Sequence, residues 1–149
     1  MAKSFAMIPS ENTSRPEPAP ALFQLLADGA LAHAALRTCG FPLAIIDAAA
    51  PGRPVTYANP AFEALFGLRT GEAAGLPLAG LIFRGDEAKL YRLLAQGPAY
   101  RELETWSKDG SVRQVEMTLG AVRNPEGRLT HWVAGFADLE RLKALAVAA

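Results

Sequence analysis

Cysteine is scarce in this 149-residue chain, which contains only Cys39. A single thiol forms neither an internal disulfide nor a metal site built from several cysteines. Histidine is almost as rare, since only His33 and His131 are present. Their spacing matches no metal-binding motif, so each is interpreted as a polar surface or interface residue. The sequence therefore predicts no metal.

Long apolar runs and an excess of one charge are also missing. No segment approaches the roughly 18–20 apolar residues that span a bilayer, and the N-terminus lacks a secretory signal pattern. Fifteen basic residues balance fifteen acidic ones, so no overall field attracts nucleic acid or an anionic membrane. We expect a cytoplasmic protein with neither a nucleic-acid partner nor a membrane partner.

Enzyme signatures are missing too. The chain has no Gly-x-Ser-x-Gly motif, no phosphate-binding loop and no His-Glu helix pair. Glu102 and Glu104 alternate along a predicted strand, and a solvated strand face explains them better than an acid–base pair does. We expect no enzymatic activity.

The most informative segment that is present is Pro54–Gly67, which reads PVTYANPAFEALFG. Val55–Tyr57 is a strand-forming run, and Asn59 follows as a cap for the free amides of a helix. Pro60 suits the first helical position, where its missing N–H costs nothing, and Gly67 suits the helix end. The segment predicts a strand that leads directly into a short capped helix.

The other elements are predicted from periodicity and turn residues. Five strands are expected: two before the short helices, and three after them that are joined by two hairpin turns. The expected strands are Leu43–Asp47, Pro54–Tyr57, Tyr100–Ser107, Ser111–Val122 and Leu129–Ala137. The expected helical pieces are Pro60–Phe66, Glu72–Ala74, Leu78–Ile82, Asp86–Leu94 and Leu139–Val147. This order predicts an α+β fold, a five-stranded antiparallel sheet with short helices on one face.

Four regions follow from this pattern. Residues 1–20 are rich in proline and are predicted to be a disordered tail. Residues 21–38 form an apolar N-terminal flanking helix, residues 41–138 the core, and residues 139–149 a C-terminal helix. The sequence leaves open whether the chain is a complete protein or a piece of a larger sensor.

Several of these features together resemble a PAS domain, and most closely its light-oxygen-voltage (LOV) branch. The features are the segment Pro54–Gly67, Gly75, the turn Lys108–Gly110 and the closing Asp138–Arg141. The resemblance extends over roughly Phe41 to Arg141. It implies a PAS fold and a sensory or signalling role.

The resemblance also identifies the residues that would carry LOV photochemistry. Counting from Gly75, the position of the flavin-reactive cysteine is Leu78, and the glutamine that ends the motif corresponds to Ile82. The amides that hold the polar edge of the flavin correspond to Thr105, Val115 and Phe136. We therefore expect no cysteine adduct, and a pocket that takes an apolar ligand or none, lined by Leu78, Ile82, Thr105, Val115, Leu119 and Phe136.

One alternative keeps a flavin, either FMN or FAD, as the cofactor. Electron transfer from Tyr57, Trp106 or Trp132 would then replace the thiol. The simpler interpretation is that Trp132 is a core residue and Trp106 a half-exposed packing residue. Haem is not expected, because the predicted long helix, residues 86–97, contains no histidine.

A homodimer is the expected assembly. The apolar N-terminal helix and the Ala/Leu-rich C-terminal helix would cover the outer face of the sheet and join two protomers. A change in the packing of these helices would transmit the signal to an unknown downstream partner. The residues expected at this interface are Leu22, Phe23, Leu26, Leu129, Val133 and Leu139.

Overall fold

The computed structural model describes residues 29–148. Its helices are α2 (Ala30–Thr38), α3 (Pro60–Phe66), α4 (Leu78–Ile82), α5 (Glu87–Ala95) and α6 (Leu139–Ala148). Its strands are β1 (Leu43–Asp47), β2 (Val55–Ala58), β3 (Ala99–Trp106), β4 (Val112–Arg123) and β5 (Leu129–Asp138). Within the described residues, 29–35 and 36–148 belong to separate units. The predicted tail and residues 21–28 of the predicted flanking helix lie outside the described residues.

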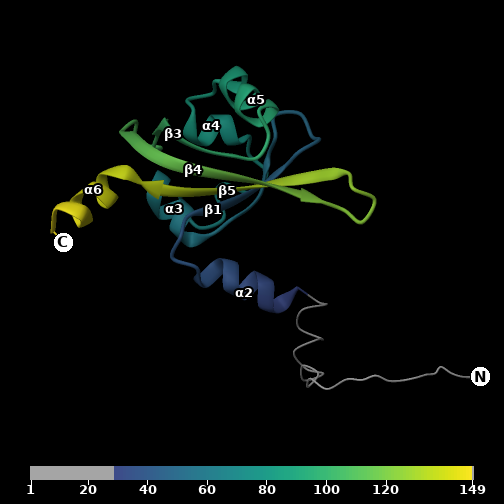
Figure 1. Ribbon diagram of the computed structural model, residues 1–149, viewed down its shortest axis with the longest axis horizontal. Coiled ribbons are helices and arrows are strands. Elements are labelled where there is room, and N and C mark those ends of the chain that lie inside the picture. Colours follow the sequence, from purple (N-terminus) through teal and green to yellow (C-terminus); the bar gives the residue numbers. More distant parts are fainter. Residues whose placement is uncertain (1–28, 149) are drawn as a thin grey trace, which may run out of the picture. The chain divides into compact units, whose positions relative to one another are not determined.

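The strands form one antiparallel sheet in the order β2-β1-β5-β4-β3. The long strands β4 and β5 run side by side through its centre, and α6 continues from the end of β5 (Figure 1). The predicted α+β fold with a five-stranded antiparallel sheet is confirmed.

The strand–cap–helix segment also forms as predicted. The Asn59 side chain is buried, and its Oδ1 accepts the backbone N–H of Phe62 at 3.0 Å. Pro60 is the first helical residue, and Gly67 ends α3 in the left-handed region with φ +70°. Because these contacts lie within a few residues, the sequence was enough to predict them.

One face of the sheet carries the core. Val115, Met117 and Leu119 alternate along β4 and are buried, whereas Gln114 and Thr118 are exposed. Side chains from α3, α4 and α5 join them in one hydrophobic cluster. This alternation, like that of Trp132, Ala134 and Phe136 on β5, confirms the predicted inner face.

Leu129 is a correction, because strict alternation along β5 placed it on the outer face. The register shifts between Val122 and Arg123, so that Val122 pairs with His131 but Arg123 pairs with Leu129. Thr130 is thereby passed over, and Leu129 packs partly buried against the core cluster. A bulge of this kind moves every residue beyond it to the other face of the sheet.

Two further expectations also change. Residues 72–74 form turns rather than a helical piece, and both flanking glycines, Gly71 and Gly75, have left-handed φ values of +76° and +83°. Leu139, expected at a dimer interface, is only 8% exposed within the protomer. The expected interface residues Leu22, Phe23 and Leu26 lie outside the described residues.

Candidate functional site

The predicted pocket residues converge in the protein interior. Leu78 and Ile82 come from α4, whereas the other four come from the strands β3, β4 and β5. Five of them are buried members of the hydrophobic cluster: Leu78, Ile82, Val115, Leu119 and Phe136. None of these five side chains carries a hydrogen-bonding group. Thr105 is buried as well, and its hydroxyl donates to the backbone carbonyl of Arg113 at 2.9 Å.

Aromatic rings pack tightly at the centre of this interior. The Phe136 ring lies 5.6 Å from the Phe62 ring and 5.4 Å from the Phe66 ring, measured between centroids. Phe62 and Phe66 are 4.8 Å apart, and all three residues have zero exposed area. Edge-to-face and tilted packing at these distances is favourable, so the three rings form a stable wall between α3 and the sheet.

These residues do not fit a flavin in the position that the LOV resemblance implies. The polar ring edge needs groups that both donate and accept hydrogen bonds, and amides supply them. Val115 and Phe136 offer neither function, and the Thr105 hydroxyl, which donates its proton to Arg113, can only accept. An unmet buried polar group costs about 1–3 kcal/mol, so each missing partner weakens flavin binding substantially.

Cys39 lies in the segment that precedes β1. It is half-buried, and its Sγ accepts the backbone N–H of Phe41 at 3.4 Å. The position implied for a flavin-reactive thiol is instead Leu78, at the start of α4 and 1% exposed. Cys39 and Leu78 thus lie on different segments of the chain.

The aromatic residues named as electron donors occupy different environments. Trp132 is buried in the core cluster, whereas Trp106 is half-exposed at the end of β3. The guanidinium of Arg84 and the ammonium of Lys89 lie 5.2 and 5.3 Å from the Trp106 ring. This confirms the packing interpretation of both tryptophans. Burial raises the pKa of the Tyr57 phenol.

Neither histidine belongs to a metal site within the described residues, where no group of three or more potential ligands occurs. His131 is half-buried on β5, and its Nδ1 lies 3.1 Å from the Thr130 hydroxyl. Among residues 29–148 no helix is long and apolar enough to span a bilayer.

The outer face of the sheet is partly apolar. Tyr100, Val112 and Val122 are exposed there, and Val133 is half-buried. Tyr100 shares this face with Glu116, and a hydrogen bond to the carboxylate of Glu116 raises the pKa of the Tyr100 phenol. Gly135 also lies on this face, where a Cβ atom would come within 2.8 Å of the Phe41 ring.

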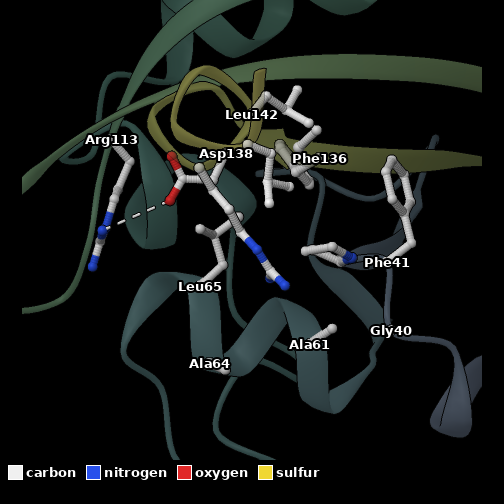
Figure 2. A pocket seen from close by; sticks show the side chains of 13 residues that line it. Gly40, Phe41, Ala61, Ala64, Leu65, Arg113, Phe136, Asp138 and Leu142 are labelled. Carbon is white, nitrogen blue, oxygen red and sulfur yellow. Dashed lines mark ion pairs between the residues drawn. The ribbon is translucent and has the colours of Figure 1, made fainter. Parts of the chain in front are cut away.

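Sequence reasoning missed a groove of about 560 Å³ between α3 and α6, which we call the α3–α6 groove (Figure 2). Its walls come from the segment before β1, from α3, from the adjoining ends of β4 and β5, and from α6. Its lining includes Phe41, Ala64, Arg113, Asp138, Arg141 and Leu142. These segments are far apart in the sequence, so no local pattern indicated that they meet.

Comparison with known proteins agrees with this architecture. The family model of the PAS fold matches residues 33–139. No curated protein matches the sequence. The solved structure of an RNA-binding light-oxygen-voltage receptor is similar, with 26% identity and a TM-score of 0.67; the match covers 92% of this chain. This chain spans only 42% of that receptor.

Two smaller LOV structures show the same fold. A LOV domain solved in work on a flavin analogue has 24% identity and a TM-score of 0.61, and the match covers 83% of this chain and 96% of that one. The LOV protein of Rhodobacter sphaeroides has 22% identity and a TM-score of 0.62, with 72% and 64% covered. Because the family model matches most of its length, the chain belongs to the PAS family of sensory and signalling domains.

Proposed function

We propose that this PAS domain is a non-enzymatic signalling module that acts as a homodimer without cysteine-adduct photochemistry. The buried apolar interior is the observation that carries the proposal. Leu78 occupies the position that the LOV resemblance assigns to the reactive cysteine, and it is almost fully buried among hydrophobic side chains. A leucine cannot form the thioether bond to an excited flavin.

The placement of Cys39 supports the same conclusion. It is the only thiol in the chain, it lies before β1, and its sulfur contacts the backbone of Phe41. Adduct formation requires direct contact between the sulfur and the flavin ring, and the position that the resemblance assigns to that sulfur is Leu78, not Cys39.

An absorption spectrum of the freshly purified protein tests the chemistry. We expect no visible absorption, both as purified and after incubation with FMN followed by desalting. Flavin absorption bands would contradict the inference that the buried apolar interior does not fit a flavin. Bleaching under blue light to a single near-ultraviolet band would show that a thiol reaches the ring, and Cys39→Ser would then identify it.

The outer face of the sheet supports the dimer. Val122 is exposed on this face one pair along the sheet from the half-buried Val133, which lies near the middle of β5. Patches of this kind mark protein–protein interfaces in soluble proteins. Two protomers joined there would hold α6 near the interface, and a change in its packing would pass the signal to a downstream partner.

Val133→Asp tests the dimer, because a carboxylate buried at an interface without a partner is strongly unfavourable. We expect a folded monomer in light scattering and circular dichroism. Leu76→Asp is the matched control, since Leu76 is 43% exposed outside this face and should leave the dimer intact. Unfolding of the Val133→Asp variant would show that Val133 is internal.

The alternative is a flavin-binding sensor that works without an adduct. The similarity to LOV structures, one of them from work on a flavin analogue, supports it. A flavin spectrum that persists without a near-ultraviolet adduct under blue light would favour this function over the first.

A further inference from the structure

The α3–α6 groove has an apolar character. Three of the chain's exposed large hydrophobic side chains line it: Phe41 at 45% exposure, Leu142 at 41% and Leu145 at 58%. Ala64 of α3 contributes a small side chain to the opposite wall and leaves space between the helices. Exposed apolar side chains that converge on one hollow indicate a binding site more strongly than scattered ones.

Charged side chains also line the groove. Arg113 and Asp138 lie at one end and Phe41 at the other (Figure 2). The Arg113 Nη1 is 3.9 Å from Asp138 Oδ2, a long ion pair, and its Nε donates to the Ser107 hydroxyl at 3.0 Å. Arg141 lines the same groove and forms no ion pair within residues 29–148.

The charges of the groove are therefore unbalanced. The two guanidinium groups of Arg113 and Arg141 face one carboxylate, that of Asp138, which also caps α6 by accepting the N–H of Glu140 at 3.0 Å. This leaves a net positive charge on the lining of an apolar channel. Guanidinium groups bind carboxylates with well-defined geometry, often through two hydrogen bonds.

We propose that the α3–α6 groove binds a free aliphatic carboxylic acid of medium chain length. Its carboxylate would lie at Arg141 and Arg113, and its hydrocarbon chain would pass Ala64 and Leu142 towards Phe41. The volume of about 560 Å³ is within the range of small-molecule sites. Phe136 borders both this groove and the core cluster, whereas the arginines and α6 belong to the groove alone.

The location of the groove gives the ligand a route to the output. An acid held there contacts α3, which is packed on the core, and α6, where residues Glu140 to Leu145 are all exposed. Filling the groove adds apolar contacts between these helices, which favours the position of α6 that closes on α3. The ligand thereby changes the element proposed above to carry the signal.

Titration of the full chain with decanoate, followed by ¹H–¹⁵N NMR and calorimetry, tests the proposal. We expect saturable binding, with the largest amide shifts at Gly40, Ala64 and Leu142. Arg141→Gln should weaken binding about tenfold, the loss expected when one charged contact worth about 1.4 kcal/mol is removed. Lys143→Gln makes the same charge change on α6 outside the groove lining and should leave the affinity unchanged.

Ala64→Trp tests the apolar half of the site. Ala64 is exposed on α3, so a larger side chain should fill the groove without disturbing the fold. We expect saturable binding of decanoate to be lost while circular dichroism stays unchanged.

Four results would overturn the proposal. Decanol binding as tightly as decanoate would remove the role of the arginines, and amide shifts centred on Ile82 and Val115 would place the acid in the core. If the protein sediments with phosphatidylglycerol vesicles and does not respond to decanoate, the groove would be a membrane-binding surface. A change of oligomeric state in Ala64→Trp, with no decanoate binding to the wild type, would assign it to a second copy of the chain.

Discussion

Asn59 connects three parts of the chain, and its substitution is the sharpest test of the structure. Its Oδ1 accepts the N–H of Phe62 at 3.0 Å and of Leu43 at 2.9 Å. Its Nδ2 donates to the carbonyls of Phe41 at 2.9 Å and Leu36 at 3.1 Å. One buried amide thus caps α3 and holds the chain that enters β1.

The size of the effect follows from these four bonds. Asn59→Ala removes a helix cap, worth about 1 kcal/mol, and three further bonds near a fully buried side chain, worth about 1 kcal/mol each. We therefore expect the free energy of unfolding to fall by about 3–4 kcal/mol. That is a large share of the roughly 5–15 kcal/mol that stabilises a typical domain.

Asn59→Asp separates the cap from the other bonds. Aspartate caps helices as well as asparagine does, so the local sequence predicts almost no change. In the structure, however, its second oxygen would replace the Nδ2 donor and face the Phe41 carbonyl, which is also an acceptor. We expect Asn59→Asp to destabilise the protein at least as much as Asn59→Ala.

Urea denaturation monitored by circular dichroism measures both variants. Asp86→Ala is the control, because Asp86 caps α5 through a single exposed bond to the Lys89 N–H at 3.1 Å and should cost only about 1 kcal/mol. If the free energy of unfolding of the Asn59→Asp variant lies within about 0.5 kcal/mol of the wild-type value, the bonds to Phe41 and Leu36 contribute little and the reasoning fails.

Two further predictions concern acid stability and the outer sheet face. The Arg69 N–H and then the Lys108 ammonium lower the pKa of Glu72 from 4.5 to about 2, so its stabilising effect is present above pH 4.5 and disappears as the pH falls towards 2. In the Glu72→Gln variant, resistance to urea should therefore fall less steeply than in the wild type as the pH is lowered through that range. The loop variant Glu126→Gln is the control and should behave like the wild type. An equally steep fall in Glu72→Gln, or the same reduced slope in Glu126→Gln, would refute this. Gly135→Ala should destabilise the wild type by about 1 kcal/mol because its Cβ would meet the Phe41 ring at 2.8 Å. In a Phe41→Ala background the same change should be neutral or stabilising, and equal effects in both backgrounds would show that the ring moves freely aside.

The elements that the sequence predicted well depend on neighbours along the chain. Asn59, Pro60 and Gly67 specify α3 through bonds and backbone angles within a single short segment. Alternation along β4 identified Val115, Met117 and Leu119 as core residues, because successive side chains of a strand point to opposite faces. The predicted pocket residues, in contrast, came from the resemblance to LOV domains.

Other features depend on contacts between segments that are distant in the sequence, so only the tertiary structure revealed them. The bulge at Thr130 turns Leu129 inward, since strand register depends on how β4 and β5 pair over their whole length. The bond from Asn59 to Leu43 joins residues 16 positions apart, and the α3–α6 groove joins segments from Gly40 to Leu145. Sequence by itself therefore determined the elements and their inner faces, because short-range hydrogen bonding and periodicity control both. The groove, the bulge and the second role of Asn59 arise only when distant segments pack, and no local pattern encodes that contact.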